Sequence, residues 1–397
     1  MTAARRCHVN RGVPCAQKPK NMPWEELTNR YKESGVVLAL GAGVSIGAGL
    51  PNWKQLLERL AAEFDAAGRL LEYEKLIQNG LTLPIIASIF EEYSSCRNEF
   101  VEKVRKALYG TFPFFQDGVS KSNRRKFLRY VKESNPTLHA VATICAVSNG
   151  DTGRLKLLPR RLRSQERSAL AAEPLSDPAI ARRVATEKRR AARRYEPNPL
   201  IRGIVTFNLD AVLQAYVYAR FEKRLLRTIE RASASSIAGK INIYHMHGFL
   251  RFDQSAGDFR KEAPDTVVLT EQDYFNFFND PTSLFNYTFL YLLREATCLF
   301  IGLSMQDENI RRMLHLSKLE RVRALRSEGV SASDARAESL RHFAILQHNR
   351  VSSVDKAIED SLLPLGTRVL WVDEWVEIPQ RLRVLYESTR NDWSIVS

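Results

Sequence analysis

The sequence predicts an α/β fold: a Rossmann-like, open and mostly parallel sheet flanked by helices, with a helical cap insertion and a basic insertion. Three apolar runs indicate it, each ending in glycine or polar residues; they lie at 36–40, 204–206 and 241–244. Short, continuous apolar runs are typical of strands buried on both faces of a parallel sheet. Ligands of such sheets bind beyond the carboxyl ends of the strands.

The run at 36–40 ends in a loop with four glycines in nine residues, and a helical pattern begins at Trp53. Glycine lets the backbone approach a ligand closely, and amides at a helix start attract phosphate. The spacing differs from the dehydrogenase fingerprint, because Ile46 occupies the position of the third glycine. Two interpretations stay open: a site for a phosphate-bearing ligand, and glycines that serve tight turning only.

The other two strand ends carry polar side chains. Asn208 and Asp210 follow the second run, just before a helical pattern at 211–221, so both could also cap that helix. The third run ends in His245, Met246, His247 and Gly248. Because the two histidines are two residues apart, we expect them to face the same side of a strand. We interpret His245 as a satisfied core or supporting histidine.

In these segments the chain resembles the sirtuin-like superfamily. The resemblance rests on a Gly-Ala-Gly-x-Ser loop at 41–45, a Thr-x-Asn-x-Asp strand end at 206–210 and a His-Gly strand end at 247–248, in that order. It continues through a Gly-x-Ser-x-x-Asp segment at 302–307, a strand and acidic helix start at 265–275, and strands at 342–347 and 366–373. Within the superfamily, the chain is most similar to bacterial antiphage effectors that consume NAD.

The resemblance implies an NAD⁺ glycohydrolase that releases nicotinamide and ADP-ribose. It implies that Asn208 holds the ribose or the attacking water, that Asp210 lies on the carboxamide side, and that His247 is the base. The implied NAD-binding residues are Gly41, Ala42, Gly43, Ser45, Pro51, Trp53, Thr206, Gly302, Ser304 and Asp307. Asp307 also precedes a helical pattern, so a capping role stays open for it.

The expected organisation is a flexible leader at 1–22, a sirtuin-like catalytic domain at 23–390 and a tail at 391–397. Within that domain, residues 70–135 are expected to form the helical cap, and 151–199 a basic insertion. The insertion holds thirteen Lys or Arg and six Asp or Glu, a balance of +7, which is half of the chain's net charge of +14. It is either a solvated segment or a surface that attracts nucleic acid.

Composition narrows the class of protein. A hydrophobic content of 44% and a charged content of 26% are ordinary for a globular enzyme. No apolar run reaches the roughly 18 residues of a membrane span, and the first residues lack the apolar core of a signal peptide. The five cysteines form no C-x-x-C pair, so we expect no zinc module and no metal, and a cytoplasmic location.

Three other functions stay open at this point. They are an NAD-dependent protein deacylase, a non-catalytic sensor of NAD or ADP-ribose, and a nucleic-acid-binding subunit that uses 151–199. The missing zinc module counts against the deacylase. For the glycohydrolase we expect NAD⁺ as substrate, a homo-oligomer, and gating by assembly or by a partner such as a DNA-translocase ATPase.

Overall fold

The computed structural model confirms the predicted fold class. It describes residues 22–65, 73–115, 117–148, 200–221, 225–230, 237, 240–252, 267–279 and 283–388. In this part of the chain, seven strands form one sheet in the order β3-β4-β2-β1-β5-β6-β7, and each pairs in parallel with its neighbours. The predicted leader at 1–22 (but for Met22), insertion at 151–199 and tail at 391–397 lie outside the described residues.

The strands are β1 (Val36–Leu40), β2 (Ile201–Thr206), β3 (Leu226–Ile229), β4 (Ile241–His245), β5 (Thr297–Ile301), β6 (His342–Gln347) and β7 (Thr367–Val372). The central strand β1 pairs with β2 on one side and with β5 on the other. After β1 the chain builds β2, β3 and β4 on one side, and then crosses to β5. The boundary between β1 and β5 is therefore the topological switch point, the place at which open parallel sheets bind ligands.

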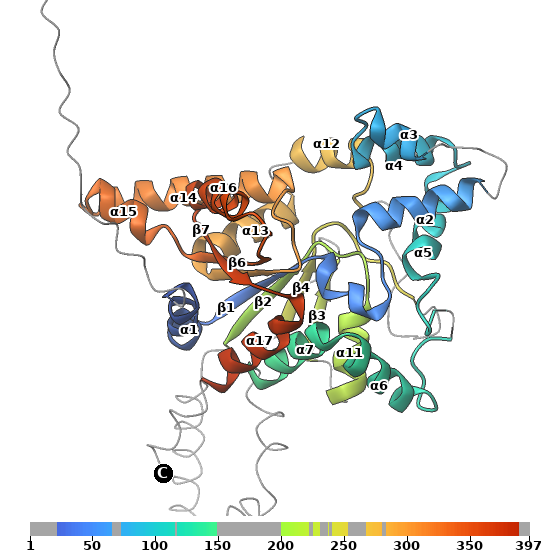
Figure 1. Cartoon of the computed structure of the whole chain (residues 1–397), viewed down its shortest axis with the longest axis horizontal. Helices are drawn as coiled ribbons and strands as arrows, with labels where there is room; N and C mark the ends of the chain where they lie inside the picture. The colour runs from blue at the N-terminus through green and yellow to red at the C-terminus, as the bar shows by residue number, and fades with distance from the viewer. Residues whose placement is uncertain are drawn as a thin grey trace, which may run out of the picture.

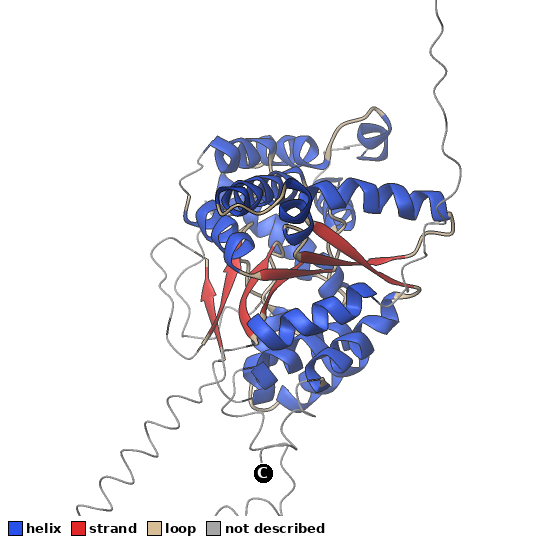
Figure 2. Ribbon diagram, turned by 90° about the vertical axis from the view of Figure 1, so that its left-hand side faces the viewer, coloured by secondary structure: helices blue, strands red, loops and turns tan. Residues whose placement is uncertain are grey.

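Helices cover both faces of the sheet (Figure 2). One layer holds α1 (Met22–Ser34), α6 (Arg124–Ser134), α7 (Pro136–Ser148), α11 (Val212–Phe221) and α17 (Ile378–Glu387). The other holds α13 (Leu284–Glu295), α14 (Glu308–Ser327), α15 (Ala332–Glu338) and α16 (Ser352–Leu362). A group beside the sheet holds α2 (Trp53–Asp65), α3 (Tyr73–Gln78), α4 (Leu83–Glu92), α5 (Arg97–Tyr109) and α12 (Glu271–Asn279) (Figure 1). Short 3₁₀ helices are η1 (Ala42–Val44), η2 (Ile46–Ala48), η4 (Leu363–Leu365) and η5 (Trp375–Glu377).

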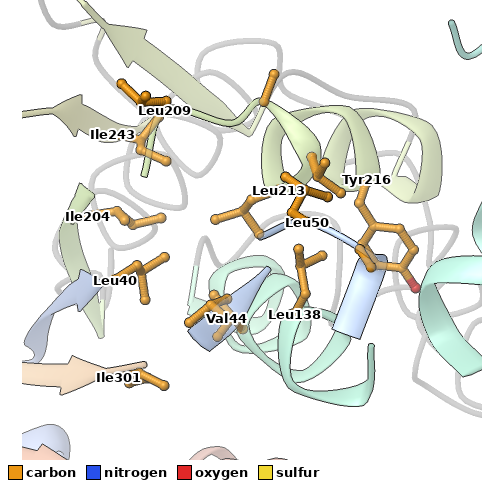
Figure 3. Packing of buried hydrophobic residues seen from close by; sticks show 14 of the residues in the cluster. Leu40, Val44, Leu50, Leu138, Ile204, Leu209, Leu213, Tyr216, Ile243 and Ile301 are labelled. Carbon is orange, nitrogen blue, oxygen red and sulfur yellow. The ribbon is translucent and has the colours of Figure 1, made fainter. Parts of the chain in front are cut away.

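Alternation along β1 divides the core in two. Val36, Leu38 and Leu40 belong to the larger hydrophobic cluster, part of which Figure 3 shows, whereas Val37 and Ala39 belong to the cluster on the opposite face. All five side chains are buried, which explains why the strand reads as a continuous apolar run. In the described part of the chain, no helix is both long and apolar enough to cross a membrane.

Several details differ from the sequence prediction. The edge strand β3 was not predicted, and residues 267–269, expected within a strand, lie outside any strand. The helices expected to form one cap separate: α4 packs against α12, whereas α6 packs against α7 and α11. The division of the chain into a catalytic domain and insertions stays a prediction.

The end of α6 packs directly on the loop that follows β1. Tyr130 donates a hydrogen bond to the Ala48 carbonyl at 3.0 Å, and the Asn135 side chain donates to the Val44 carbonyl at 2.8 Å. A Cβ atom at Gly47 would lie 2.6 Å from the Ser134 carbonyl oxygen. Glycine at 47 is thus required by the close approach of two backbones.

We predict that Gly47→Ala lowers the free energy of unfolding by about 1–3 kcal/mol, because a backbone atom must move to admit the methyl group. Gly203→Ala is the matched control, since its added Cβ meets only the Asn242 carbonyl at 3.8 Å, an ordinary contact. Urea denaturation of both variants measures the difference. Equal stability of the two variants would contradict the packing described for η2 and α6.

Candidate active site at the carboxyl edge of the sheet

Hydrogen bonds continue across the sheet beyond the carboxyl ends of four strands. The Met246 amide donates to the Thr206 carbonyl at 2.9 Å, and the Phe207 amide donates to the Leu40 carbonyl at 3.0 Å. On the other side of β1, the Gly41 amide donates to the Ile301 carbonyl at 3.0 Å. The segments that follow β4, β2, β1 and β5 therefore lie side by side, as the sequence motifs predicted.

The glycines of the first loop serve contact between two loops. The Gly43 amide donates to the Gly302 carbonyl at 3.0 Å. A Cβ at Gly41 would lie 2.5 Å from the Gly302 carbonyl oxygen, and one at Gly43 would lie 2.7 Å from the Gly302 Cα. Gly302 itself has a φ of 70°, in the region that favours glycine. Packing alone thus explains these three glycines, while their contact with NAD stays a prediction.

The predicted helix does not begin directly after the loop. Two 3₁₀ turns, η1 and η2, intervene before α2 starts at Trp53. At that start Asn52 and Gln55 cap each other: the Gln55 amide donates to the Asn52 side chain at 2.9 Å, and the Asn52 amide donates to the Gln55 side chain at 3.0 Å. The sequence predicted that amides at this helix start would bind a phosphate. Two of them, those of Asn52 and Gln55, already donate to side chains of the protein.

Asn208 is fixed by its neighbours on three sides. Its amide donates to Thr206 Oγ1 at 3.1 Å, and its carbonyl accepts from His245 Nδ1 at 3.0 Å. Its side-chain Nδ2 donates to the Gly41 carbonyl at 3.0 Å and to Ser45 Oγ at 3.3 Å. No described residue donates to its Oδ1. The half-buried Asn208 side chain can therefore offer a ligand one free hydrogen-bond acceptor.

Asp210 lies below this asparagine and is only 6% exposed. Its Oδ1 accepts a hydrogen bond from the Val212 amide at 3.0 Å, at the start of α11, so the capping interpretation of Asp210 is confirmed. Burial raises the pKa of the Asp210 carboxyl, although hydrogen bonds from Ser45, the Val212 amide and Asn208 act to lower it. The buried Asp210 carboxyl thus connects Ser45 of the glycine loop with Asn208. Contact of Asp210 with the nicotinamide carboxamide stays a prediction.

The two histidines lie on opposite sides of the sheet, so the expectation that they face the same side was wrong. His245 is the last residue of β4, and its ring contacts Phe249 of the larger cluster at a centroid distance of 4.5 Å. His247 lies beyond the strand, where alternation no longer holds, and its ring contacts Phe207 of the opposite cluster at 5.3 Å. Both imidazoles are buried.

The ring of His247 is also 5.7 Å from that of Tyr274 in α12. The Tyr274 hydroxyl donates a hydrogen bond to the Asp307 carboxylate and accepts one from the Trp53 indole. Burial lowers the pKa of the His247 imidazole, and the negative charge of Asp307 opposes that shift. Trp53, Asp307 and His247, predicted from three distant motifs, are thus joined around one tyrosine.

Asp307 has a structural role as well. Its Oδ1 accepts from the Ile310 amide at 2.9 Å and so caps α14. The predicted contact of Asp307 with a ribose hydroxyl stays a prediction. The same holds for Ser304, which is exposed on this loop, and for Pro51, which is buried beneath the glycine loop.

An ion-pair cluster holds α12 against the cap helices. Arg97 of α5 donates to both carboxylate oxygens of Asp273 at 3.0 Å, to Glu91 at 2.7 Å and to the Val267 carbonyl at 2.6 Å. Since Tyr274 follows Asp273 directly, this cluster fixes the position of the Tyr274 ring beside His247. Here the helices predicted as a cap do reach the candidate site.

A small cavity lies beneath Asn208, with a volume of about 10 Å³, room for about one water molecule. Its floor is apolar and includes Leu40, Val44, Leu213 and Ile243, all labelled in Figure 3. Its polar lining consists of Ser45, Thr206, Asn208, Asp210, Gln214 and His245. Among the described residues, no group of three or more His, Cys, Asp or Glu side chains could hold a metal ion.

Part of the chain matches a known family. Residues 202–362 match the family model of the SIR2-like domain, and the matched segment contains Asn208, Asp210, His247, Gly302 and Asp307. The match supports the sirtuin-like superfamily. The match also supports, in general terms, a function related to NAD. The glycine loop at 41–45 lies before the matched residues, and no curated protein matches the chain.

The sequence prediction missed two residues of this region, Gln214 and the Tyr274 side chain. Gln214 lies on the first turns of α11 and Asp210 precedes the first residue of that helix, so helical spacing does not relate the two side chains. Tyr274 offers no signal either, because its place beside His247 depends on the long-range contacts of α12.

We predict that Asn208→Asp lowers the free energy of unfolding by about 1–3 kcal/mol at neutral pH, because a carboxylate oxygen would face the Gly41 carbonyl with no proton to donate. The repulsion raises the pKa of the introduced carboxyl in the folded state, so the deficit shrinks as pH falls and the group becomes protonated. Urea denaturation at several pH values measures it. Asn276→Asp, at an exposed asparagine of α12 whose Oδ1 accepts a hydrogen bond from Gln272, is the control. A deficit that is absent or independent of pH would contradict the donor role of Nδ2.

Proposed function

We propose that the chain is an NAD⁺ glycohydrolase that releases nicotinamide and ADP-ribose. One observation carries this proposal. Asn208 Nδ2 donates to the Gly41 carbonyl and to Ser45 Oγ, which holds the side chain at the carboxyl edge of the sheet next to β1 and leaves Oδ1 as an acceptor without a donor among the described residues. A carbonyl oxygen in that state can accept from a ribose hydroxyl or an attacking water. The match to the SIR2-like domain over this segment supports NAD as the ligand.

The reaction needs little acid catalysis. Nicotinamide leaves from a positively charged ring nitrogen, so the leaving group requires no proton, and the transition state resembles the oxocarbenium ion of glycoside hydrolysis. What the protein must supply is orientation of the sugar, delivery of water and stabilisation of positive charge. In this proposal Asn208 orients the water or the ribose.

His247 is the proposed base. Because burial keeps its pKa below the ordinary value, its imidazole is neutral at neutral pH and can accept a proton. The nearby Asp307 carboxylate then stabilises the imidazolium that forms. General-base assistance of this kind is worth about 10²–10⁴-fold in rate.

We predict that Asn208→Ala and His247→Ala each lower kcat for nicotinamide release by about 10²-fold or more. Free nicotinamide is measured after incubation of the purified proteins with NAD⁺. His315→Ala, which removes an exposed histidine on α14, is the control and should keep wild-type activity. Full activity in both active-site variants would refute the assignment of these residues, and a wild-type protein that binds NAD⁺ without cleaving it would favour the sensor.

We further propose that the activity serves antiphage defence by depleting NAD⁺ in the infected cell. The resemblance to the bacterial defence branch supports this role. An unregulated NADase would kill its own host, so we propose gating by homo-oligomer assembly or by a partner such as a DNA-translocase ATPase.

The gating proposal predicts slow NAD⁺ cleavage by the purified protein alone and an increase of at least about tenfold on activation. The measurement compares nicotinamide release across protein concentrations, and with and without the candidate ATPase. A rate per protein molecule that is already maximal in dilute solution, and unchanged by the partner, would overturn gating but would leave the NADase proposal intact.

A further inference from the structure

The chemistry above leaves unused a pair of side chains, the buried His245, which contacts Asn208, and the half-buried Gln214. His245 is 1% exposed, and its Nδ1 lies 3.0 Å from the Asn208 carbonyl oxygen. On the other side of the ring, Nε2 faces the side-chain amide nitrogen of Gln214. The pair connects α11 and β4 with the loop that follows β2.

The hydrogen bonds determine which nitrogen carries the proton. The Asn208 carbonyl can only accept, so Nδ1 of His245 must donate to it. The imidazole is neutral at physiological pH, because burial lowers the pKa of His245 to about 4. Nε2 is then an acceptor, and the Gln214 amide donates to it. Gln214 thereby locks the ring in the tautomer that Asn208 needs.

We propose that His245 and Gln214 are positioning residues that hold Asn208 in the geometry required for NAD⁺ cleavage. Their action passes through the Asn208 backbone, because His245 binds its carbonyl while Thr206 Oγ1 accepts from its amide. With the backbone fixed at both ends, the side chain reaches Gly41 and Ser45 and keeps Oδ1 toward the ligand. This role rests on the proposed function.

The cavity beneath Asn208 fits the same arrangement. Gln214 Oε1 is buried and has no hydrogen-bond partner among the described residues, and Gln214 and Asp210 both line the cavity. One water in this space could donate to Gln214 Oε1. Asp210 is the ionisable side chain that shares the cavity with His245; the ring's other neighbours are Asn208, Gln214, the Gly248 backbone and Phe249.

The kinetic test uses two substitutions of His245. His245→Leu removes the donor to Asn208, and kcat should fall by about 10–100-fold while KM changes less than about threefold, since displacement of a reacting group affects rate more than binding. His245→Asn retains an N–H donor, which can replace Nδ1, and should recover most of the lost kcat. His139→Leu is the matched control, because His139 is also a histidine of low pKa, about 4, bound to Tyr216 at 2.7 Å on the far side of α11. It should keep wild-type kcat.

Gln214→Glu tests the tautomer. A carboxylate cannot donate to Nε2, so His245 must carry protons on both nitrogens, and its pKa should rise well above 4. The wild-type profile of kcat against pH should show no step from His245 between pH 5 and 8, whereas the Gln214→Glu profile should show one. Gln214→Leu should lower kcat without adding such a step.

A readout independent of catalysis separates this proposal from the proposed function. NMR of asparagine-labelled protein should show slow solvent exchange of the Asn208 side-chain amide protons in the wild type and in His245→Asn, and fast exchange in His245→Leu. If the wild type cleaves no NAD⁺ but this pattern holds, the proposed function fails and the positioning role stands. Slow exchange in His245→Leu, or equal kcat in His245→Leu and wild type, would overturn the positioning role.

Discussion

Contact between the backbones that follow β1 and β5 is the constraint on which the candidate site depends. Gly43 donates to the Gly302 carbonyl, and a side chain at Gly41, Gly43 or Gly302 would collide with the opposite loop. This contact occurs at the switch point of the sheet, where a crevice is expected. It fixes the positions of the Gly41 carbonyl and of Ser45, which in turn hold Asn208.

Backbone contacts therefore position the side chains of the candidate site. Buried polar groups are costly unless they are hydrogen-bonded, and here each one restrains the next. Ser45 contacts both Asn208 and Asp210, and Asp210 also caps α11, so a helix start, a loop and a strand end share one network. Among the described residues, no donor reaches Asn208 Oδ1, so this oxygen can still accept a hydrogen bond. Such restraint limits the motion of the Asn208 side chain, as the proposed catalytic role requires.

The sequence predicted the parts of this arrangement that depend on local pattern. Strand β1 is confirmed residue for residue, because its five buried side chains form a continuous apolar run. Strand β3 was missed since its residues Leu226–Ile229 are mostly half-buried at the sheet edge and carry no such pattern. The partners of His139 and His245 were also out of reach, because Tyr216 and Gln214 meet them only after α11 packs against α7 and β4.

The two histidines show how a strand end alters a periodic argument. A spacing of two places side chains on one face only while the strand continues, and β4 stops at His245. Beyond that residue the chain turns, so that His247 contacts Phe207 and Tyr274 on the other face of the sheet. The turn therefore gives the two histidines different surroundings, one on each face of the sheet. His245 stays neutral and is hydrogen-bonded to the Asn208 carbonyl, while His247 shares its surroundings with Asp307, whose charge favours proton uptake. One short segment thus provides a fixed hydrogen-bond donor and a group suited to act as a base.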